Sequence, residues 1–306
     1  MKTNETWRRR DLLLSGVAAA ALPWGITAAQ AAPHRLPRHI TDCQVHIWDG
    51  GKPSPTGRQG VFLAEDMLKE MDAAGVERAV LVTPSWSPNG NGYSLQAAQK
   101  YPKRFAVMGN FDISAPADPK ALADWKKQKG MLGISLFLAS PKGKAWMTDG
   151  SADWFWPVLE KHNIPLMIFA SGMMPALAAI ASKHPHLKIS IDQFGIPTNT
   201  FGTQGFADYD AVLAMAKHPN VTIKLESVPF ISTDPYPYAN LHPVLHRLYD
   251  TFGPHRMFWG SDFTLLKTPY KDCVTFMKEI PWLSDRDLDL IMGRAISRWI
   301  GWPLPA

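Results

Sequence analysis

Short apolar segments alternate with amphipathic segments along almost the whole chain, and this alternation constrains the fold more than any other feature. Residues 78–82, for example, read as a buried strand, whereas residues 64–74 carry apolar side chains at helical spacing and precede Gly75, a common helix stop. The predicted strands are 40–47, 78–82, 105–108, 133–138, 165–169, 187–192, 221–225 and 256–260. The predicted helices are 64–74, 93–100, 119–127, 154–162, 174–183, 209–217, 241–251 and 270–279, with a last helix from 283 to about 300.

Eight strand–helix pairs in succession are what a (β/α)8 barrel, or TIM barrel, requires. The strands are short and nearly all apolar, which is typical of parallel strands that are covered on both faces. An open, doubly wound sheet is the alternative, and it needs a glycine-rich phosphate turn after the first strand. Residues 46–51 read His-Ile-Trp-Asp-Gly-Gly and lack that pattern. We therefore predict an α/β protein with a single TIM-barrel domain at residues 39–304.

The first residues of the chain have the pattern of an export signal. Arg8, Arg9 and Arg10 precede an apolar run at 12–22, and Ala-Gln-Ala at 29–31 fits cleavage between small residues. A membrane span needs about 20 apolar residues, so this run is too short to be an anchor. We predict a twin-arginine-type signal peptide at residues 1–31 and a short linker at 32–38. The mature protein is then periplasmic or extracytoplasmic, the Tat translocase is its partner during export, and no stable membrane association is expected.

Charge and cysteine content exclude several classes of protein. The net charge is only +5, without clusters of Lys and Arg, so no nucleic-acid partner is expected. Cys43 and Cys273 are too few for a disulfide framework. Strand alternation places Cys43 on the face opposite His46, toward the helices, so we expect a buried thiol and not a disulfide. The sequence does not indicate an oligomeric state.

Motifs at the predicted strand ends resemble a known family. They are 41–48 (Thr-Asp-Cys-Gln-Val-His-Ile-Trp), 191–195 (Ile-Asp-Gln-Phe-Gly), 221–225 (Val-Thr-Ile-Lys-Leu), 259–263 (Trp-Gly-Ser-Asp-Phe) and a closing segment at 290–302. Together they are similar to the amidohydrolase-related (amidohydrolase 2) family of barrel hydrolases. The resemblance is to the branch that contains sugar and dicarboxylate lactonases and aromatic-acid decarboxylases, and it implies a small-molecule substrate.

The chain departs from the metal-binding pattern that the resemblance implies. The family usually has His-x-His at the end of the first strand, a His at the end of the fifth strand and Asp-His after the sixth. Here Gln44-Val45-His46, Phe169 and Asp192-Gln193 stand at these places, whereas the final Gly-Ser-Asp is kept at 260–262. A catalytic zinc takes three protein ligands, and amides and Phe do not supply them. We therefore predict no cofactor and no tightly held metal.

Other metal-binding arrangements stay open from the sequence. A metal could bind through residues outside the family pattern, such as Glu226 or His242, and weak binding of a divalent metal is compatible with the residues that remain.

Without a metal, a side chain must activate water. Asp262 is the predicted general base, because the resemblance implies a proton-transferring Asp at the end of the last strand and an apolar surrounding can raise a carboxyl pKa. The structural alternative is that Asp262 caps a helix. His46 is predicted to protonate the leaving oxygen or to hold the substrate carbonyl, and the alternative is a purely structural imidazole. Lys224 is predicted to pair with Glu226 or Asp262, either as an electrostatic clamp for the substrate or as a structural ion pair.

The predicted mouth of the barrel is rich in aromatic residues. Substrate-binding roles are predicted for Gln44, Trp48, Phe169, Gln193 and Glu226. The aromatic residues favour a flat or apolar substrate. No Arg stands at the strand ends to act as the bidentate partner that a dicarboxylate would need, so a dicarboxylate lactone is not the expected substrate.

These features predict an exported TIM-barrel hydrolase that cleaves a lactone or a similar ester-like C–O bond without a metal. Two alternatives remain. The first is a non-hydrolytic lyase or isomerase, similar to a decarboxylase, on the same barrel. The second is a periplasmic binding protein that has lost catalysis together with the family's His residues.

Overall fold

Eight parallel strands form one sheet, in which each strand pairs with the next in sequence. The computed structural model describes residues 35–304 except 38, 54, 56, 114–117, 199, 207–208 and 267, so the predicted signal peptide at 1–31 lies outside the described residues. The strands are β1 Thr41–Val45, β2 Arg78–Val82, β3 Phe105–Asn110, β4 Met131–Phe137, β5 Leu166–Phe169, β6 Ile189–Ile191, β7 Val221–Leu225 and β8 Met257–Trp259.

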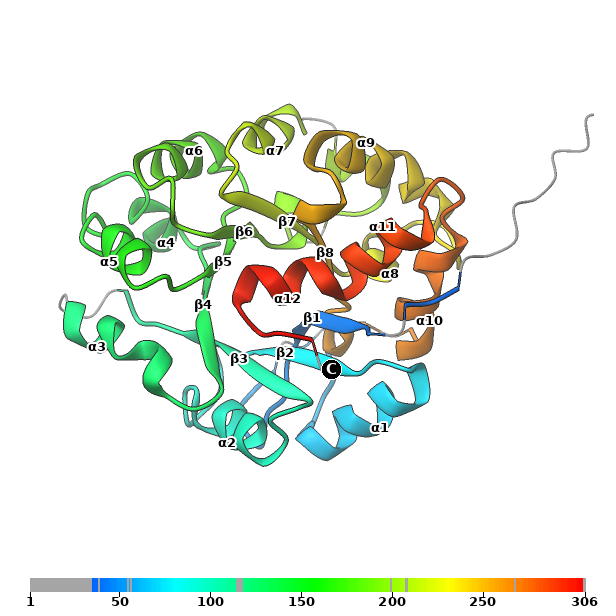
Figure 1. Ribbon diagram of the computed structural model, residues 1–306, viewed down its shortest axis with the longest axis horizontal. Helices are drawn as coiled ribbons and strands as arrows, with labels where there is room; N and C mark the ends of the chain where they lie inside the picture. Colours follow the sequence, from blue (N-terminus) through cyan, green and yellow to red (C-terminus); the bar gives the residue numbers. More distant parts are fainter. Residues whose placement is uncertain are drawn as a thin grey trace, which may run out of the picture. The chain divides into compact units, whose positions relative to one another are not determined.

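The sheet curls until its last strand meets its first. The backbone N–H of Asp262, just after β8, donates to the carbonyl oxygen of Gln44 in β1 at 3.0 Å. Figure 1 shows the strands surrounded by helices, as the predicted (β/α)8 barrel requires. The prediction of a TIM barrel is therefore confirmed for the residues that the structure describes.

Helices follow the strands on the outside of the barrel (Figure 1). They are α1 Ala64–Ala74, α2 Gly92–Lys100, α3 Pro119–Ala123, α4 Pro141–Ala145, α5 Phe155–Lys161, α6 Met174–Lys183, α7 Asp210–Leu213, α8 Val228–Ile231, α9 His242–Phe252, α10 Tyr270–Thr275, α11 Asp285–Asp289 and α12 Ala295–Ile300. Short 3-10 turns are η1 Trp125–Lys127, η2 Gln193–Gly195, η3 Gly202–Phe206, η4 Ala214–Lys217, η5 Ala239–Leu241, η6 Pro254–Arg256, η7 Phe263–Leu265 and η8 Phe276–Glu279, and η9 Leu290–Arg294 is a π-helical turn.

Helix α12 covers the amino-terminal end of the barrel. Arg78, the first residue of β2, donates to Oγ of Ser297 in α12 at 2.7 Å, and Ile296 and Ile300 pack against apolar side chains inside the barrel. With that end covered, the carboxyl ends of the strands are the side on which a site can open.

Cys43 faces the barrel interior, contrary to the expectation that it faces the helices. It packs with Val80, Met108 and Phe258 inside the barrel, because the register of β1 shifts between Asp42 and Val45 and breaks simple alternation. Both cysteines are buried and free, as expected. Within the described part of the chain, no helix has the length and apolar character that crossing a bilayer demands.

Candidate active site

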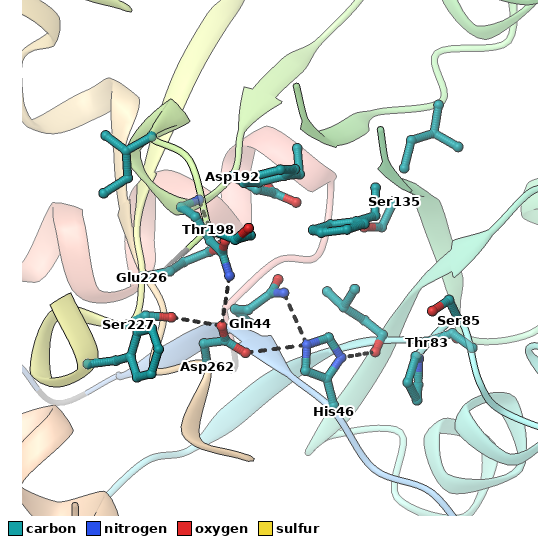
Figure 2. A pocket seen from close by; sticks show the side chains of 18 of the residues that line it. Gln44, His46, Thr83, Ser85, Ser135, Asp192, Thr198, Glu226, Ser227 and Asp262 are labelled. Carbon is teal, nitrogen blue, oxygen red and sulfur yellow. Dashed lines mark hydrogen bonds and ion pairs between the residues drawn. The ribbon is translucent and has the colours of Figure 1, made fainter. Parts of the chain in front are cut away.

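A cavity of about 440 Å³ opens at the carboxyl ends of the strands. Residues at or directly after all eight strands line it, including Gln44 from β1, Asp192 after β6, Glu226 after β7 and Asp262 after β8. Figure 2 shows these side chains pointing toward one another. The predicted site therefore lies where TIM-barrel enzymes carry theirs.

Asp262 is fully buried and its carboxylate lies at the centre of this group. Its Oδ2 accepts hydrogen bonds from Ser227 Oγ at 2.7 Å and from Gln193 Nε2 at 3.1 Å, and its Oδ1 lies 3.3 Å from Nε2 of His46 (Figure 2). The side chain makes no capping bond to the 3-10 turn η7 that follows it. The alternative reading of Asp262 as a helix cap is therefore not supported.

The two ring nitrogens of His46 have different partners. Nδ1 lies 2.7 Å from the carbonyl oxygen of Val82, and because a carbonyl only accepts, Nδ1 carries a hydrogen. Nε2 faces Asp262 and lies 3.4 Å from Nε2 of Gln44. The exchangeable proton of His46 is therefore the one on Nε2, next to the carboxylate of Asp262.

Lys224 is fully buried beneath the cavity and is surrounded by oxygen atoms. Its ammonium contacts Oε1 of Glu226, lies 3.1 Å from Oδ1 of Asp192 and donates to Oε1 of Gln44 at 2.6 Å. The predicted pairing with Glu226 is thus found, whereas no ion pair with Asp262 occurs among the described residues. Because an ammonium only donates, it turns the oxygen of Gln44 toward itself and leaves the amide NH2 facing His46 and the cavity.

Burial and charge shift the titration of this cluster. Burial raises the pKa of Glu226 to about 8, although the Lys224 ammonium opposes this. Burial also raises the pKa of Asp192 against the same ammonium. Burial alone would lower the pKa of Lys224, but the nearby carboxylates outweigh it and raise that pKa above its usual value. The carboxyl groups of Asp192 and Glu226, which share one ammonium, therefore have higher pKa values than exposed carboxyl groups.

Three of the site residues adopt left-handed backbone conformations. They follow three neighbouring strands: Gln193 after β6 (φ 47°), Ser227 after β7 (φ 55°) and Asp262 after β8 (φ 52°). For residues other than glycine this conformation costs roughly 1 kcal/mol or more, and such strain collects at functional sites. It turns the three side chains toward one another, so that Ser227 and Gln193 both reach Oδ2 of Asp262.

Six of the eight predicted site residues line the cavity. These are Gln44, His46, Phe169, Gln193, Glu226 and Asp262. Lys224 lies beneath them. Trp48 is buried outside the described lining, where it packs edge-on against Trp86, so the structure does not support its predicted contact with substrate.

Sequence reasoning overlooked Ser227 and the role of Asp192. The signal available was position, since Asp192 directly follows β6 and Ser227 lies two residues beyond β7. Polar residues at those places face the mouth of a parallel barrel.

The described residues do not fit a tightly bound divalent metal. Among them, no group of three or more His, Cys, Asp or Glu side chains is placed to hold a metal ion. Nδ1 of His46 donates a hydrogen bond to the carbonyl oxygen of Val82, and the amide nitrogen of Gln193 donates one to Oδ2 of Asp262. The alternative ligands are not brought together either: Glu226 contacts Lys224, and His242 lies in α9 with Nε2 3.3 Å from the carbonyl oxygen of Pro237.

Comparison with known proteins agrees with the resemblance of the motifs. L-fucono-1,5-lactonase of Burkholderia ambifaria is 26% identical over 231 residues, 72% of this chain and 79% of that protein. A 4-sulfomuconolactone hydrolase of Hydrogenophaga intermedia is 27% identical over 212 residues, 65% of this chain and 64% of that protein.

Solved structures share the fold. An amidohydrolase from Burkholderia multivorans, solved with bound zinc, superposes with a TM-score of 0.74 at 18% identity and covers 87% of this chain and 100% of that one. A 5-carboxyvanillate decarboxylase of Novosphingobium aromaticivorans, solved with manganese, gives 0.62 at 16% identity and covers 87% and 96%. The sequence model described as "Amidohydrolase" matches residues 41–301. The chain therefore belongs to the amidohydrolase family.

Proposed function

We propose that this protein is a lactonase-like hydrolase that opens a lactone or a similar ester-like C–O bond, with Asp262 as general base and without a tightly bound metal. The observation that carries the proposal is the carboxylate of Asp262, which lines the cavity, accepts hydrogen bonds from the side chains of Ser227 and Gln193 and lies 3.3 Å from Nε2 of His46. The lactone hydrolases among the relatives support the same reaction class.

The reaction follows from which groups can accept and donate. Asp262 removes a proton from water, the water oxygen attacks the carbonyl carbon, and the carbonyl electron pair moves onto its oxygen. The amide NH2 of Gln44, fixed by Lys224, donates to that oxygen. When the carbonyl re-forms, the C–O bond breaks and the leaving oxygen takes a proton from Nε2 of His46, which enters the reaction as an imidazolium with hydrogens on both ring nitrogens.

The proton balance closes within the site. Protonated Asp262 returns its proton to His46 across their 3.3 Å contact, so that one water and one lactone give one hydroxy acid and the enzyme is restored. Ser227 and Gln193, which donate to Oδ2 of Asp262, leave Oδ1 as the oxygen that handles the proton.

The proposal is tested by measuring the conversion of a lactone in ¹⁸O-labelled water by the wild type and by the Asp262→Asn variant. Incorporation of one label into the carboxylate, with turnover in the variant reduced about 1,000-fold, is the expected result. Asp42→Asn is the matched control, because Asp42 is equally buried and lies outside the described lining of the cavity. Unchanged turnover in Asp262→Asn excludes Asp262 as the base.

The same experiment separates the alternatives. A product without label identifies a lyase or isomerase, for which the decarboxylase among the structures of the same fold is the precedent. Tight binding of unaltered lactones without turnover identifies a binding protein.

We also propose that the protein is exported through the twin-arginine pathway to the periplasm or beyond, as residues 1–31 suggest. Replacing Arg9 and Arg10 together by Lys is expected to retain the protein in the cytoplasm. Equal periplasmic yield of this variant and the wild type in cell fractionation would contradict the proposal.

A further inference from the structure

The charged groups that line the cavity are almost all acidic. They comprise three carboxyl groups, from Asp192, Glu226 and Asp262, together with one imidazole, and the described lining contains no Lys or Arg. The ammonium of Lys224 lies below the lining and its contacts are taken up by three protein oxygens. A negatively charged substituent entering the cavity would therefore meet a wall of carboxyl groups and no Lys or Arg that is free to pair with it.

One wall of the cavity is an aromatic surface. The rings of Phe137 and Phe169, at the ends of β4 and β5, are stacked with centroids 4.6 Å apart and planes 18° apart. Phe137 lines the cavity although 60% of it is exposed. Apolar side chains that gather at one place on the surface often mark a ligand-binding site, and a flat ring suits a stacked aromatic pair. Trp86, in the segment after β2, and Phe230, in α8, add aromatic surface.

The remaining polar groups of the lining are neutral. Besides Gln44, Gln193 and Ser227, they are the hydroxyl and amide side chains of Thr83, Ser85, Asn110, Ser135, Thr198 and Thr200. Such groups bind carbonyl, hydroxyl or ether oxygens, but they do not compensate a full negative charge as a bidentate Arg does.

From these walls we infer that the substrate is an uncharged aryl lactone or aryl ester, whose aromatic ring lies on the Phe137–Phe169 pair while its carbonyl reaches His46 and Asp262. The position of the substrate carbonyl at His46 and Asp262 rests on the proposed function. The presence of an aromatic ring and the absence of charge on the substrate are inferred from the cavity walls alone. The inference separates this chain from relatives whose names specify a sulfonated lactone, and from a fold neighbour named for a pyrone dicarboxylic acid.

The first test compares three substrates and two inert analogues. The substrates are dihydrocoumarin, its ring-carboxylated derivative and the aliphatic δ-valerolactone. The analogues are 2-tetralone, which replaces the ring oxygen of dihydrocoumarin by CH2 and so keeps the ring and the carbonyl but has no ester bond, and its ring-carboxylated derivative. We expect kcat/KM for dihydrocoumarin to exceed that of the carboxylated form about 100-fold, because like charges within a binding site cost several kcal/mol. We expect it to exceed δ-valerolactone about tenfold through ring contact. Binding of both analogues is measured by calorimetry with wild type and Asp262→Asn.

Failure of the two proposals can be told apart. If 2-tetralone binds and its carboxylated form does not, while no lactone is opened, the proposed hydrolase is wrong and the assignment of the cavity stands. If lactones are opened but the carboxylated or aliphatic compound is used equally well, the assignment is overturned and the hydrolase stands.

Two variants test the walls directly. Thr198 lies on the exposed rim of the lining, so a longer side chain can be placed there. Thr198→Arg adds a cation at this position, and Thr198→Gln is its uncharged control. The Arg variant is expected to raise kcat/KM for the carboxylated lactone about tenfold at low salt, with the gain fading at high salt. Phe137→Ala is expected to weaken 2-tetralone binding about tenfold, and Val61→Ala, a change of an exposed apolar residue outside the described lining, is its control. Unchanged tetralone binding in Phe137→Ala overturns the placement of the ring.

Discussion

His46 and Asp262 are joined through one nitrogen and one oxygen, 3.3 Å apart, while the other nitrogen of His46 is held 2.7 Å from the carbonyl oxygen of Val82. The carbonyl fixes the ring, so the proton on Nε2 is the only one that His46 can exchange with the cavity. The amidohydrolase from Burkholderia multivorans that shares this fold was solved with bound zinc. The chemistry proposed for the present chain depends instead on His46 and Asp262.

The His46→Gln variant is expected to lose the acid that protonates the leaving oxygen. An alkoxide leaves poorly without a proton, whereas a phenolate leaves more readily. We therefore expect kcat to fall about 100-fold for aliphatic lactones and about tenfold or less for aryl lactones. Steady-state kinetics with a series of leaving groups of graded basicity measures the difference. His246→Gln, on α9 and outside the described lining, is the control. An equal loss for all leaving groups would assign His46 to positioning alone.

The Lys224→Met variant is expected to affect stability and turnover together. Removing the ammonium leaves Glu226 and Asp192 buried and facing each other without a cation, and loss of one partner of a buried pair costs about 3–5 kcal/mol of unfolding free energy. It also frees the amide of Gln44 to rotate, so that its NH2 no longer faces the cavity.

The double variant Lys224→Met/Glu226→Gln separates these two effects. Removing one carboxylate together with the ammonium should restore part of the lost stability in denaturant unfolding. The turnover defect should persist, because Gln44 stays unfixed. Recovery of turnover in step with stability would show that Lys224 has only a structural role.

The positions of the strands could be predicted closely from the sequence, and the geometry of the site could not. The predicted segments 78–82 and 221–225 coincide with β2 and β7, because strands buried on both faces leave a compact signature along the chain. Predicted helices such as 270–279 are instead divided into an α-helix and a 3-10 turn, a distinction that side-chain periodicity does not encode.

Cys43, whose orientation is predicted wrongly, and Ser227, which the sequence does not single out, differ from expectation for a related physical reason. Cys43 turns inward because of a register shift in β1, and Ser227 reaches Asp262 because both residues have positive φ. Register shifts and the sign of φ at residues other than glycine are imposed by tertiary packing, so a single sequence does not reveal them. The prediction for Trp48 differs for another reason. Its place near a strand end predicts contact with the cavity, but Trp86, which packs edge-on against Trp48, lines the cavity instead.

Asp42 is expected to make stability depend on pH. Its carboxylate accepts from the backbone N–H groups of Gln44 and Ser261 and from the hydroxyl of Tyr270, yet burial outweighs these bonds and raises its pKa from 3.8 to about 6. A raised carboxyl pKa means that the folded state binds the proton more tightly. This contribution is present in full below pH 4 and is lost as the pH rises through 6.

The Asp42→Asn variant isolates this contribution, since Asn resembles the protonated acid. The variant should match the wild type near pH 4 and exceed its unfolding free energy by up to about 3 kcal/mol at pH 8, the equivalent of a shift of about two pKa units. Urea unfolding of both proteins at several pH values measures the difference. A difference that does not change with pH would contradict the raised pKa.

Removal of metal is expected to leave the activity intact. The described residues bring together no set of three ligand side chains, and the ammonium of Lys224 already lies among Gln44, Asp192 and Glu226 oxygens, where a divalent cation would be repelled. Dialysis against a strong chelator should change kcat by less than about twofold, and added zinc or manganese should not raise it. Elemental analysis of the purified protein provides the independent measurement. Zinc or manganese in a one-to-one ratio with the chain, lost together with turnover and restored with it, would refute the metal-free mechanism, since it would require ligands that rearrange away from Lys224 and His46.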